Sequence, residues 1–160
     1  MKKDFGVQQV ADIVPFPHFS YQIAGHYEEG QLVERLENLA DQLDPFSVTA
    51  GGLSLFTGSH PVLFVPVVRT LRLSQVHQAV WQSLAHVGAE ISAYYQEEMW
   101  VPHITLAEHD ITSEKLASII SRFSTRVLSC KIAIDNIAVI WHTGTKQEVR
   151  YRFALQSREH

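Results

Sequence analysis

One five-residue pattern occurs twice in this chain of 160 residues. Proline, histidine, an apolar residue, a small hydroxyl residue and a second apolar residue follow one another as PHFSY at 17–21 and as PHITL at 102–106, 85 positions later. Each copy is followed, after a short connection, by an amphipathic helical pattern. Such a repeat predicts two similar halves joined in tandem.

Each copy also predicts a strand that presents an imidazole and a hydroxyl on one side. Residues i and i+2 of a strand face the same way, so His18 would project with Ser20, and His103 with Thr105. The apolar residues between them are expected to face the core: Phe19, Tyr21, Ile104 and Leu106. A single histidine of this kind is usually structural, but the duplicated pattern with proline before each histidine favours a chemical site.

Three amphipathic helices are predicted from apolar residues at helical spacing, at about 29–44, within 73–88 and within 110–123. Pro45 ends the first helix. Ser74 is the expected N-cap of the second, which Gly88 ends, and Thr112 or Ser113 caps the third.

Segments rich in β-forming residues lie between these helices, at 18–25, 51–58, 61–68, 103–108, 131–141 and 149–155. Two hairpins are predicted, turning at 58–61 and at 143–147. This order of elements predicts an α+β fold with antiparallel sheets rather than a parallel βαβ sheet. Because no linker or low-complexity tract interrupts the chain, we expect one domain over residues 1–160, with two pseudo-symmetric lobes.

The composition limits the classes of partner. A formal net charge of −4 and a pI near 6.1 give the surface no general field for binding polyanions, so phosphate recognition must be local. The single cysteine, Cys130, rules out an intramolecular disulfide and is expected to be a small core residue. Since the sequence has no apolar run long enough for a membrane span and its first ten residues lack the apolar core of an export signal, we expect a cytoplasmic protein.

Two imidazoles that meet in space can divide the work of an in-line phosphoryl transfer. The neutral imidazole accepts a proton from the nucleophile, and the protonated one donates a proton to the leaving oxygen. Hydroxyl groups beside them can donate hydrogen bonds to the non-bridging phosphate oxygens. A pseudo-twofold arrangement of the two halves would bring these four groups together, and the chemistry would need no metal.

The doubled His-x-Ser/Thr-x pattern resembles the two-histidine (2H) phosphoesterase superfamily, which includes the 2′-5′ RNA ligase-like proteins and the 2′,3′-cyclic nucleotide phosphodiesterases. The first copy resembles the extended signature HxTLxFxG of that family through His18, Ser20, Tyr21, Ile23 and Gly25. The second copy, PHITLA, is close to the usual form. The resemblance extends from about residue 12 to residue 155.

The resemblance implies a bilobal, pseudo-twofold LigT-like fold in which two antiparallel sheets form a central groove with helices outside. It further implies a monomer that acts without metal or cofactor on a 2′,3′-cyclic phosphate of a nucleotide or RNA end, or on 2′-5′ linkages. His18 and His103 would then be the general acid and base, and Ser20 and Thr105 would bind the phosphate. The alternative is a module that binds a nucleotide or RNA end in the same groove without turnover.

The sequence departs from the family pattern in several places. Ser20 and Tyr21 replace the commoner threonine and leucine, which preserves the hydroxyl and changes only packing. Glu108 and Gln22 stand where basic residues are common, which argues against binding of long RNA. The 17 residues before His18 predict a trimmed first lobe or a very short N-terminal strand.

Other candidates are more open. Four aromatic residues either stack a nucleobase at the mouth of the groove or belong to the core: Tyr94, Tyr95, Trp100 and Trp141. Five basic residues are candidates for a phosphate contact: Arg69, Arg72, Lys131, Arg150 and Arg152. The other histidines are expected to be solvated, with two of them on a helix (His77 and His86) and the rest elsewhere (His26, His60, His109, His142 and His160). None of them shows metal-ligand spacing.

Overall fold

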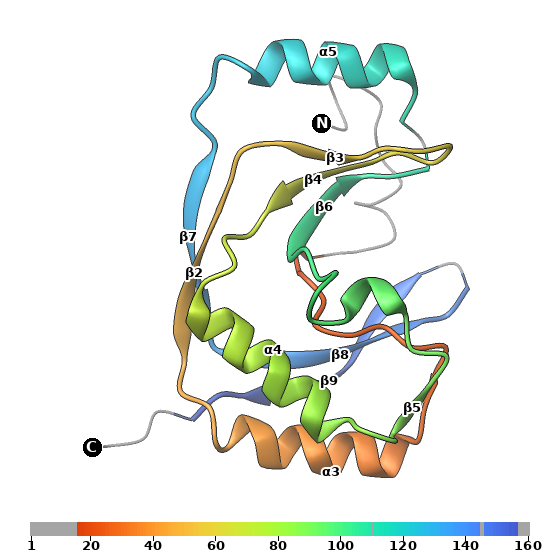
Figure 1. Cartoon of the computed structure of the whole chain (residues 1–160), viewed down its shortest axis with the longest axis vertical. Coiled ribbons are helices and arrows are strands. Elements are labelled where there is room, and N and C mark those ends of the chain that lie inside the picture. Colours follow the sequence, from red (N-terminus) through yellow and green to blue (C-terminus); the bar gives the residue numbers. More distant parts are fainter. Residues whose placement is uncertain (1–15, 110, 145, 157–160) are drawn as a thin grey trace.

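The computed structural model describes residues 16–109, 111–144 and 146–156. Within these residues, three α-helices combine with antiparallel β-sheets (Figure 1), as the sequence predicts. The predicted trimming of the N-terminus concerns residues that lie mostly outside the described part of the chain. Among the described residues, no helix has the length and apolar character needed to cross a membrane.

The three helices are α3 (Glu29–Ala40), α4 (Leu71–Ser83) and α5 (Ser113–Phe123). The Glu28 carboxylate accepts hydrogen bonds from the N–H groups of Gly30 and Gln31 and so caps α3. Helix α3 ends four residues earlier than predicted, although Leu43 in the following turn is still buried. Thr112 caps α5 as predicted, by accepting a hydrogen bond from the Lys115 N–H.

The prediction for the ends of α4 is wrong. The helix begins at Leu71, and the hydroxyl of Thr70, not that of Ser74, caps it by accepting from the Leu73 N–H at 3.2 Å. Leu71 is strongly exposed, so it adds nothing to the apolar face from which the helix was recognised. The helix ends at Ser83, before Gly88, and His86 therefore lies in a turn with a positive φ of 66° rather than on the helix.

All strand pairs in the described residues are antiparallel. The strands are β1 (His26–Tyr27), β2 (Phe46–Gly51), β3 (Ser54–Phe56), β4 (Val62–Pro66), β5 (Gly88–Ala89), β6 (His103–Ala107), β7 (Ser129–Ile134), β8 (Asn136–His142) and β9 (Gln147–Ala154). Strands β3, β4 and β6 form one sheet, whereas β1 pairs with β5, β2 with β7, and β8 with β9. Both predicted hairpins, β3–β4 and β8–β9, are confirmed. Strand β2 was not predicted.

The predicted strand over residues 18–25 is wrong for nearly all of its length. This segment has no regular secondary structure, and β1 starts only at His26. Isolated backbone hydrogen bonds hold it instead: the Ser92 N–H donates to the Ile23 carbonyl at 2.9 Å, and the Gly25 N–H donates to the Ala89 carbonyl at 3.1 Å. Alternation of apolar and polar residues does not make a strand where a continuous partner ladder is missing.

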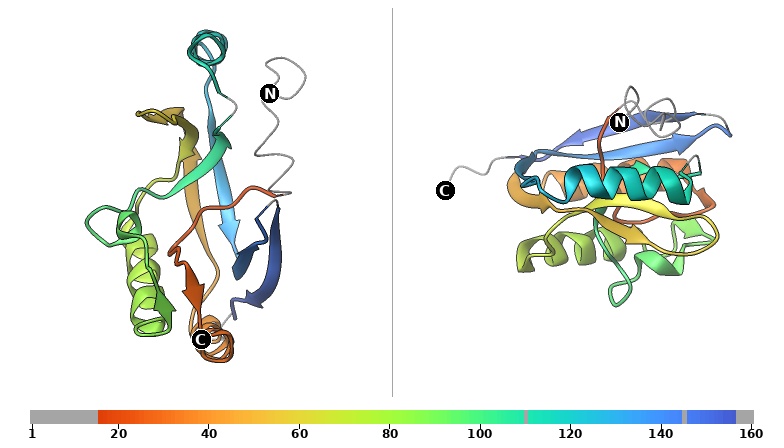
Figure 2. Two further views of the ribbon diagram at one scale, coloured as in Figure 1. Left: turned by 90° about the vertical axis from the view of Figure 1, so that its right-hand side faces the viewer. Right: turned by 90° about the horizontal axis from the view of Figure 1, so that it is seen from above.

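The order of elements repeats along the chain. The first motif is followed by α3, β2 and the hairpin β3–β4, and the second motif, on β6, is followed by α5, β7 and the hairpin β8–β9. The two equivalent strands β2 and β7 pair with each other along their whole length, from Phe46 opposite Ile134 to Gly51 opposite Ser129. Helices α3 and α5 lie at opposite ends of the molecule (Figures 1 and 2).

Within the described residues, three clusters of buried residues form the core, and all three join the halves. Helix α3 packs with α4 and with the hairpin of the other half through Leu32, Leu36, Ile137 and Val139. Helix α5 likewise packs against the first hairpin, through Ile119 and Leu63. The third cluster surrounds Trp100, and the predicted core residues Phe19, Tyr21 and Ile104 pack against it.

The prediction for Cys130 is also wrong, because its side chain is exposed. The first three residues of β7 are all exposed, and only from Ile132 onward does the strand alternate between exposed and half-buried side chains. The thiol therefore lies outside the core.

The N-cap of α4 can be tested by substitution. We expect Thr70→Ala to lower the free energy of unfolding by about 1 kcal/mol, because the Leu73 N–H loses its partner. The control, Ser74→Ala, is expected to cost less than about 0.5 kcal/mol, since that hydroxyl accepts only from the exposed Arg69 side chain. Urea unfolding of the two variants measures the difference. An equal loss would contradict the cap at Thr70.

Candidate active site

His103 is the first residue of β6 and lies on an aromatic wall. Its ring centroid is 5.0 Å from that of Phe56 and 5.0 Å from that of Phe64, and the two phenyl rings stack on each other at 4.2 Å. Register pairing sets His103 opposite Pro66 and Thr105 opposite Phe64 on β4. Thr105 therefore lies two residues along the same strand and shares the face of His103.

Both motif histidines make the same local hydrogen bond. Nδ1 of His18 is 3.3 Å from the carbonyl oxygen of Phe16, and Nδ1 of His103 is 2.6 Å from that of Val101. In each case the acceptor lies two residues before the histidine, with a proline between them. A carbonyl can only accept, so Nδ1 carries the proton and Nε2 is the nitrogen left with a lone pair in the neutral ring.

The charges of the two histidines interact. Burial is the main cause that lowers the pKa of His18; the hydrogen bond to the Phe16 carbonyl raises it, and the positive charge of His103 lowers it further. The structure thus brings within electrostatic reach two imidazoles that are 85 positions apart in the sequence. A positive charge on His103 therefore disfavours protonation of His18.

Ser20 differs from Thr105 in its setting. Because residues 17–20 form no strand, strand geometry does not place its hydroxyl beside His18 as predicted. Its carbonyl oxygen accepts a hydrogen bond from the indole N–H of Trp100 at 2.9 Å, and the neighbouring Tyr21 carbonyl accepts one from the indole N–H of Trp81 at 3.0 Å. Ser20 is half-buried.

Comparison with known families identifies the family of the chain. A family model described as the 2′-5′ RNA ligase superfamily matches residues 5–146. The chain belongs to the 2′-5′ RNA ligase superfamily. No curated protein is significantly similar to it.

A solved structure supports the fold. The crystal structure of TT0787 of Thermus thermophilus matches with a TM-score of 0.62 and 16% sequence identity, over 89% of this chain and 80% of that chain. The predicted fold class, an α+β LigT-like arrangement with antiparallel sheets, is therefore confirmed.

Four aromatic residues of this superfamily member were predicted either to stack a nucleobase or to belong to the core. Trp100 belongs to the core. It is 3% exposed and stacks on the ring of His77 with centroids 3.9 Å apart, so it offers no face to a nucleobase. Tyr95 is half-buried and packs against the same cluster, and Trp141 packs against the first cluster with the Arg150 guanidinium over its ring. Tyr94 is 76% exposed.

Three of the candidate basic residues are engaged elsewhere. Arg150 forms an ion pair with Glu29 at 2.7 Å, and Glu29 also accepts a hydrogen bond from the Tyr151 hydroxyl. Arg69 donates to the Glu97 carbonyl and Arg72 to the Asp44 carbonyl. Lys131 and Arg152 are exposed on β7 and β9. These contacts tie structural elements together rather than mark a phosphate site.

The prediction that His77 is solvated is wrong. Its side chain is 1% exposed, and its Nε2 lies 2.9 Å from the Tyr95 carbonyl oxygen. Burial is the largest cause that lowers its pKa. The sequence carried a signal for this position, because His77 lies four residues after the buried Leu73 on the apolar face of α4. The other predicted surface histidines in the described residues are exposed; His160 lies outside them.

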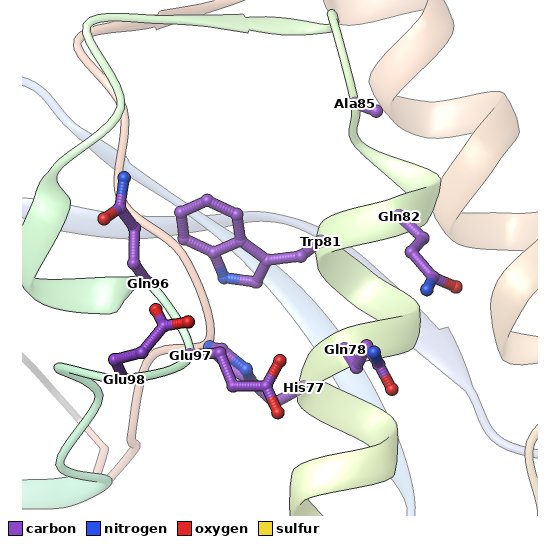
Figure 3. Close-up of a pocket in the computed structure, with 8 residues that line it drawn as sticks. All are labelled: His77, Gln78, Trp81, Gln82, Ala85, Gln96, Glu97 and Glu98. Carbon is purple, nitrogen blue, oxygen red and sulfur yellow. The ribbon is translucent and has the colours of Figure 1, made fainter.

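His77 also lines a hollow beside α4 (Figure 3). This cavity of about 430 Å³ is lined by Trp81, Gln96 and Glu97, among others, and a second of about 320 Å³ lies between α3 and α4. Neither is lined by His18 or His103, so the central groove implied by the family resemblance stays a prediction. Within the described residues, no group of three or more metal-ligating side chains is arranged to hold a metal ion.

The electrostatic contact between the two histidines can be measured directly. We expect His103→Gln to raise the pKa of His18, because it removes a positive charge that now disfavours protonation there. An NMR titration of the His18 ring protons measures the change, with His86→Gln in the exposed turn after α4 as the control. An unchanged His18 pKa in His103→Gln would show that the rings do not interact.

Proposed function

We propose that this protein is a metal-independent phosphoesterase that opens 2′,3′-cyclic phosphates of nucleotides or RNA ends, or cleaves 2′-5′ linkages, with His18 and His103 as its acid and base. One observation carries the proposal. Two histidines from equivalent positions make the same Nδ1–carbonyl hydrogen bond, and their charges interact. Membership of the 2′-5′ RNA ligase superfamily supports the same class of substrate.

The lowered pKa of His18 favours the role of base in hydrolysis. A ring that stays neutral near pH 7 can use Nε2 to accept a proton from the attacking water. As the water oxygen bonds to phosphorus, one ester oxygen of the cyclic phosphate leaves with the bonding electron pair. This leaving oxygen takes a proton from Nε2 of protonated His103. The product is a phosphate monoester with a free hydroxyl. The roles of the two histidines exchange in the reverse reaction.

The hydroxyls of Ser20 and Thr105 complete the proposed site. Each would donate a hydrogen bond to a non-bridging oxygen, on which negative charge accumulates in the transition state. Thr105 and His103 lie on the same face of β6, which supports a phosphate contact by the hydroxyl of the second motif. In this proposal, residues 1–160 form a single domain of two pseudo-symmetric lobes that acts as a monomer without a cofactor.

Turnover in the presence of EDTA tests the proposal. We expect hydrolysis of 2′,3′-cyclic nucleotides with a bell-shaped pH profile, and a loss of kcat of about 10²–10⁴-fold in either His18→Ala or His103→Ala. His60→Ala, in the exposed turn of the β3–β4 hairpin, is the matched control.

Activity that persists in both variants would contradict the proposal. Saturable nucleotide binding without product would instead favour the binding module. The assay should include an ADP-ribose cyclic phosphate and 2′-5′-linked oligonucleotides, since substrate specificity is usually set by loops rather than by the residues of the two motifs.

The phosphate contact of Thr105 can be separated from packing. We expect Thr105→Val, which keeps the shape of the side chain and removes the hydroxyl, to lower kcat/KM by about 10²-fold. Thr105→Ser keeps the hydroxyl and should retain most of the activity. Equal losses in the two variants would point to packing against β4 rather than to a phosphate contact.

A further inference from the structure

The two motif histidines are held in different ways. His103 starts a strand whose backbone is paired with β4. His18 lies in a segment without regular structure, so no strand ladder fixes its position relative to His103. In-line proton transfer at one phosphate requires the two imidazoles to keep a fixed separation. The backbone hydrogen bonds of Ile23 and Gly25 lie further along the segment, so a contact nearer to His18 is needed to hold it.

The indole of Trp100 makes such a contact. Its N–H donates to the carbonyl oxygen of Ser20 at 2.9 Å. Ser20 is two residues after His18, and Trp100 is three residues before His103. This one hydrogen bond therefore joins the first motif to the chain that leads directly into the second.

The indole itself is rigidly packed. The His77 ring stacks on it at a centroid distance of 3.9 Å with an interplanar angle of 16°, and the Tyr21 ring stacks on it at 5.8 Å with an angle of 29°. The guanidinium of Arg69 lies 5.6 Å from its ring centroid. With 3% of its surface exposed, Trp100 cannot turn its N–H away without disturbing the core.

We propose that Trp100 is a positioning residue that fixes His18 relative to His103 through its hydrogen bond to the Ser20 carbonyl. This inference rests on the proposed function for its catalytic consequence. His77 assists by holding the plane of the indole. Neither side chain is proposed to touch the substrate.

Trp100→Phe removes the donor and keeps an aromatic ring. Because the Ser20 carbonyl loses its partner, the His18 segment shifts, and a displacement of about 1 Å is enough to lower a rate by about 10²-fold. We expect a loss of that size, mainly in kcat, together with a changed pH profile. Trp81→Phe is the matched control: it removes an indole N–H from the adjacent Tyr21 carbonyl but leaves the bond between the motifs, so kcat should stay within about threefold.

A second readout needs no turnover. In the parent protein, His103→Gln is expected to raise the His18 pKa, and in the Trp100→Phe background this response should shrink, because the two rings no longer keep their separation. NMR titration of His18 in four proteins (the parent, His103→Gln, Trp100→Phe and the protein with both substitutions) measures how strongly His103 affects the His18 pKa with and without the indole. If the parent protein hydrolyses no cyclic phosphate, the proposed function fails, and the coupling alone decides the role of Trp100.

A near-isosteric replacement covers the case in which Trp100→Phe does not fold. The chain has three tryptophans, so the double variant Trp81→Phe with Trp141→Phe has Trp100 as its one remaining tryptophan. Incorporation of benzothienylalanine at position 100 of this double variant then replaces the indole N–H with a sulfur in a ring system of similar shape. The proposal is supported if the protein with benzothienylalanine at position 100 has a lower kcat, and a smaller effect of His103→Gln on the His18 pKa, than the double variant that keeps Trp100. Unchanged kcat, or unchanged coupling, overturns it.

Discussion

The antiparallel pairing of β2 with β7 is the constraint on which the rest of the fold depends. The two strands occupy equivalent places in the repeated order of elements, and equivalent strands that pair antiparallel relate their halves by an approximate twofold rotation. This rotation also sets the positions of the helices and hairpins that are connected to the two strands. Helices α3 and α5 go to opposite ends, and the two hairpins lie on either side of the paired strands (Figure 2). His18 is thereby brought within range of the charge of His103, which is 85 positions away in the sequence.

The local surroundings then make the two equivalent histidines different. His103 is backed by Phe56 and Phe64 on a paired strand, whereas His18 rests on a segment anchored by side chains. Equivalent Nδ1–carbonyl bonds leave Nε2 as the nitrogen with a lone pair in both neutral rings. In the proposed function, this unequal packing of the two histidines would supply the asymmetry that separate acid and base roles require.

Much of this arrangement could be predicted from sequence because its signals are local. Helical spacing identified three helices, and the Gly58–Pro61 turn identified a hairpin. The duplicated motif pointed to the 2′-5′ RNA ligase superfamily. What failed depended on distant partners: a strand over residues 18–25 needs a neighbouring ladder, and burial of His77 depends on Trp100, which lies 23 positions away in the sequence. Strand β2 carried a local signal that the prediction did not use, because its sequence FSVTAG alternates apolar residues with small or polar ones.

The packing of each helix against the hairpin of the other half has an evolutionary consequence. A chain containing one motif, one helix, one long strand and one hairpin would leave its helix without the surface that α3 finds on β8–β9 and that α5 finds on β4. Two copies of such a half, exchanged across a twofold axis, would complete both cores at once. A fused tandem chain keeps that exchange within one molecule. A half of this kind would need a second copy to cover its helix, and each copy would bring one of the two motif histidines.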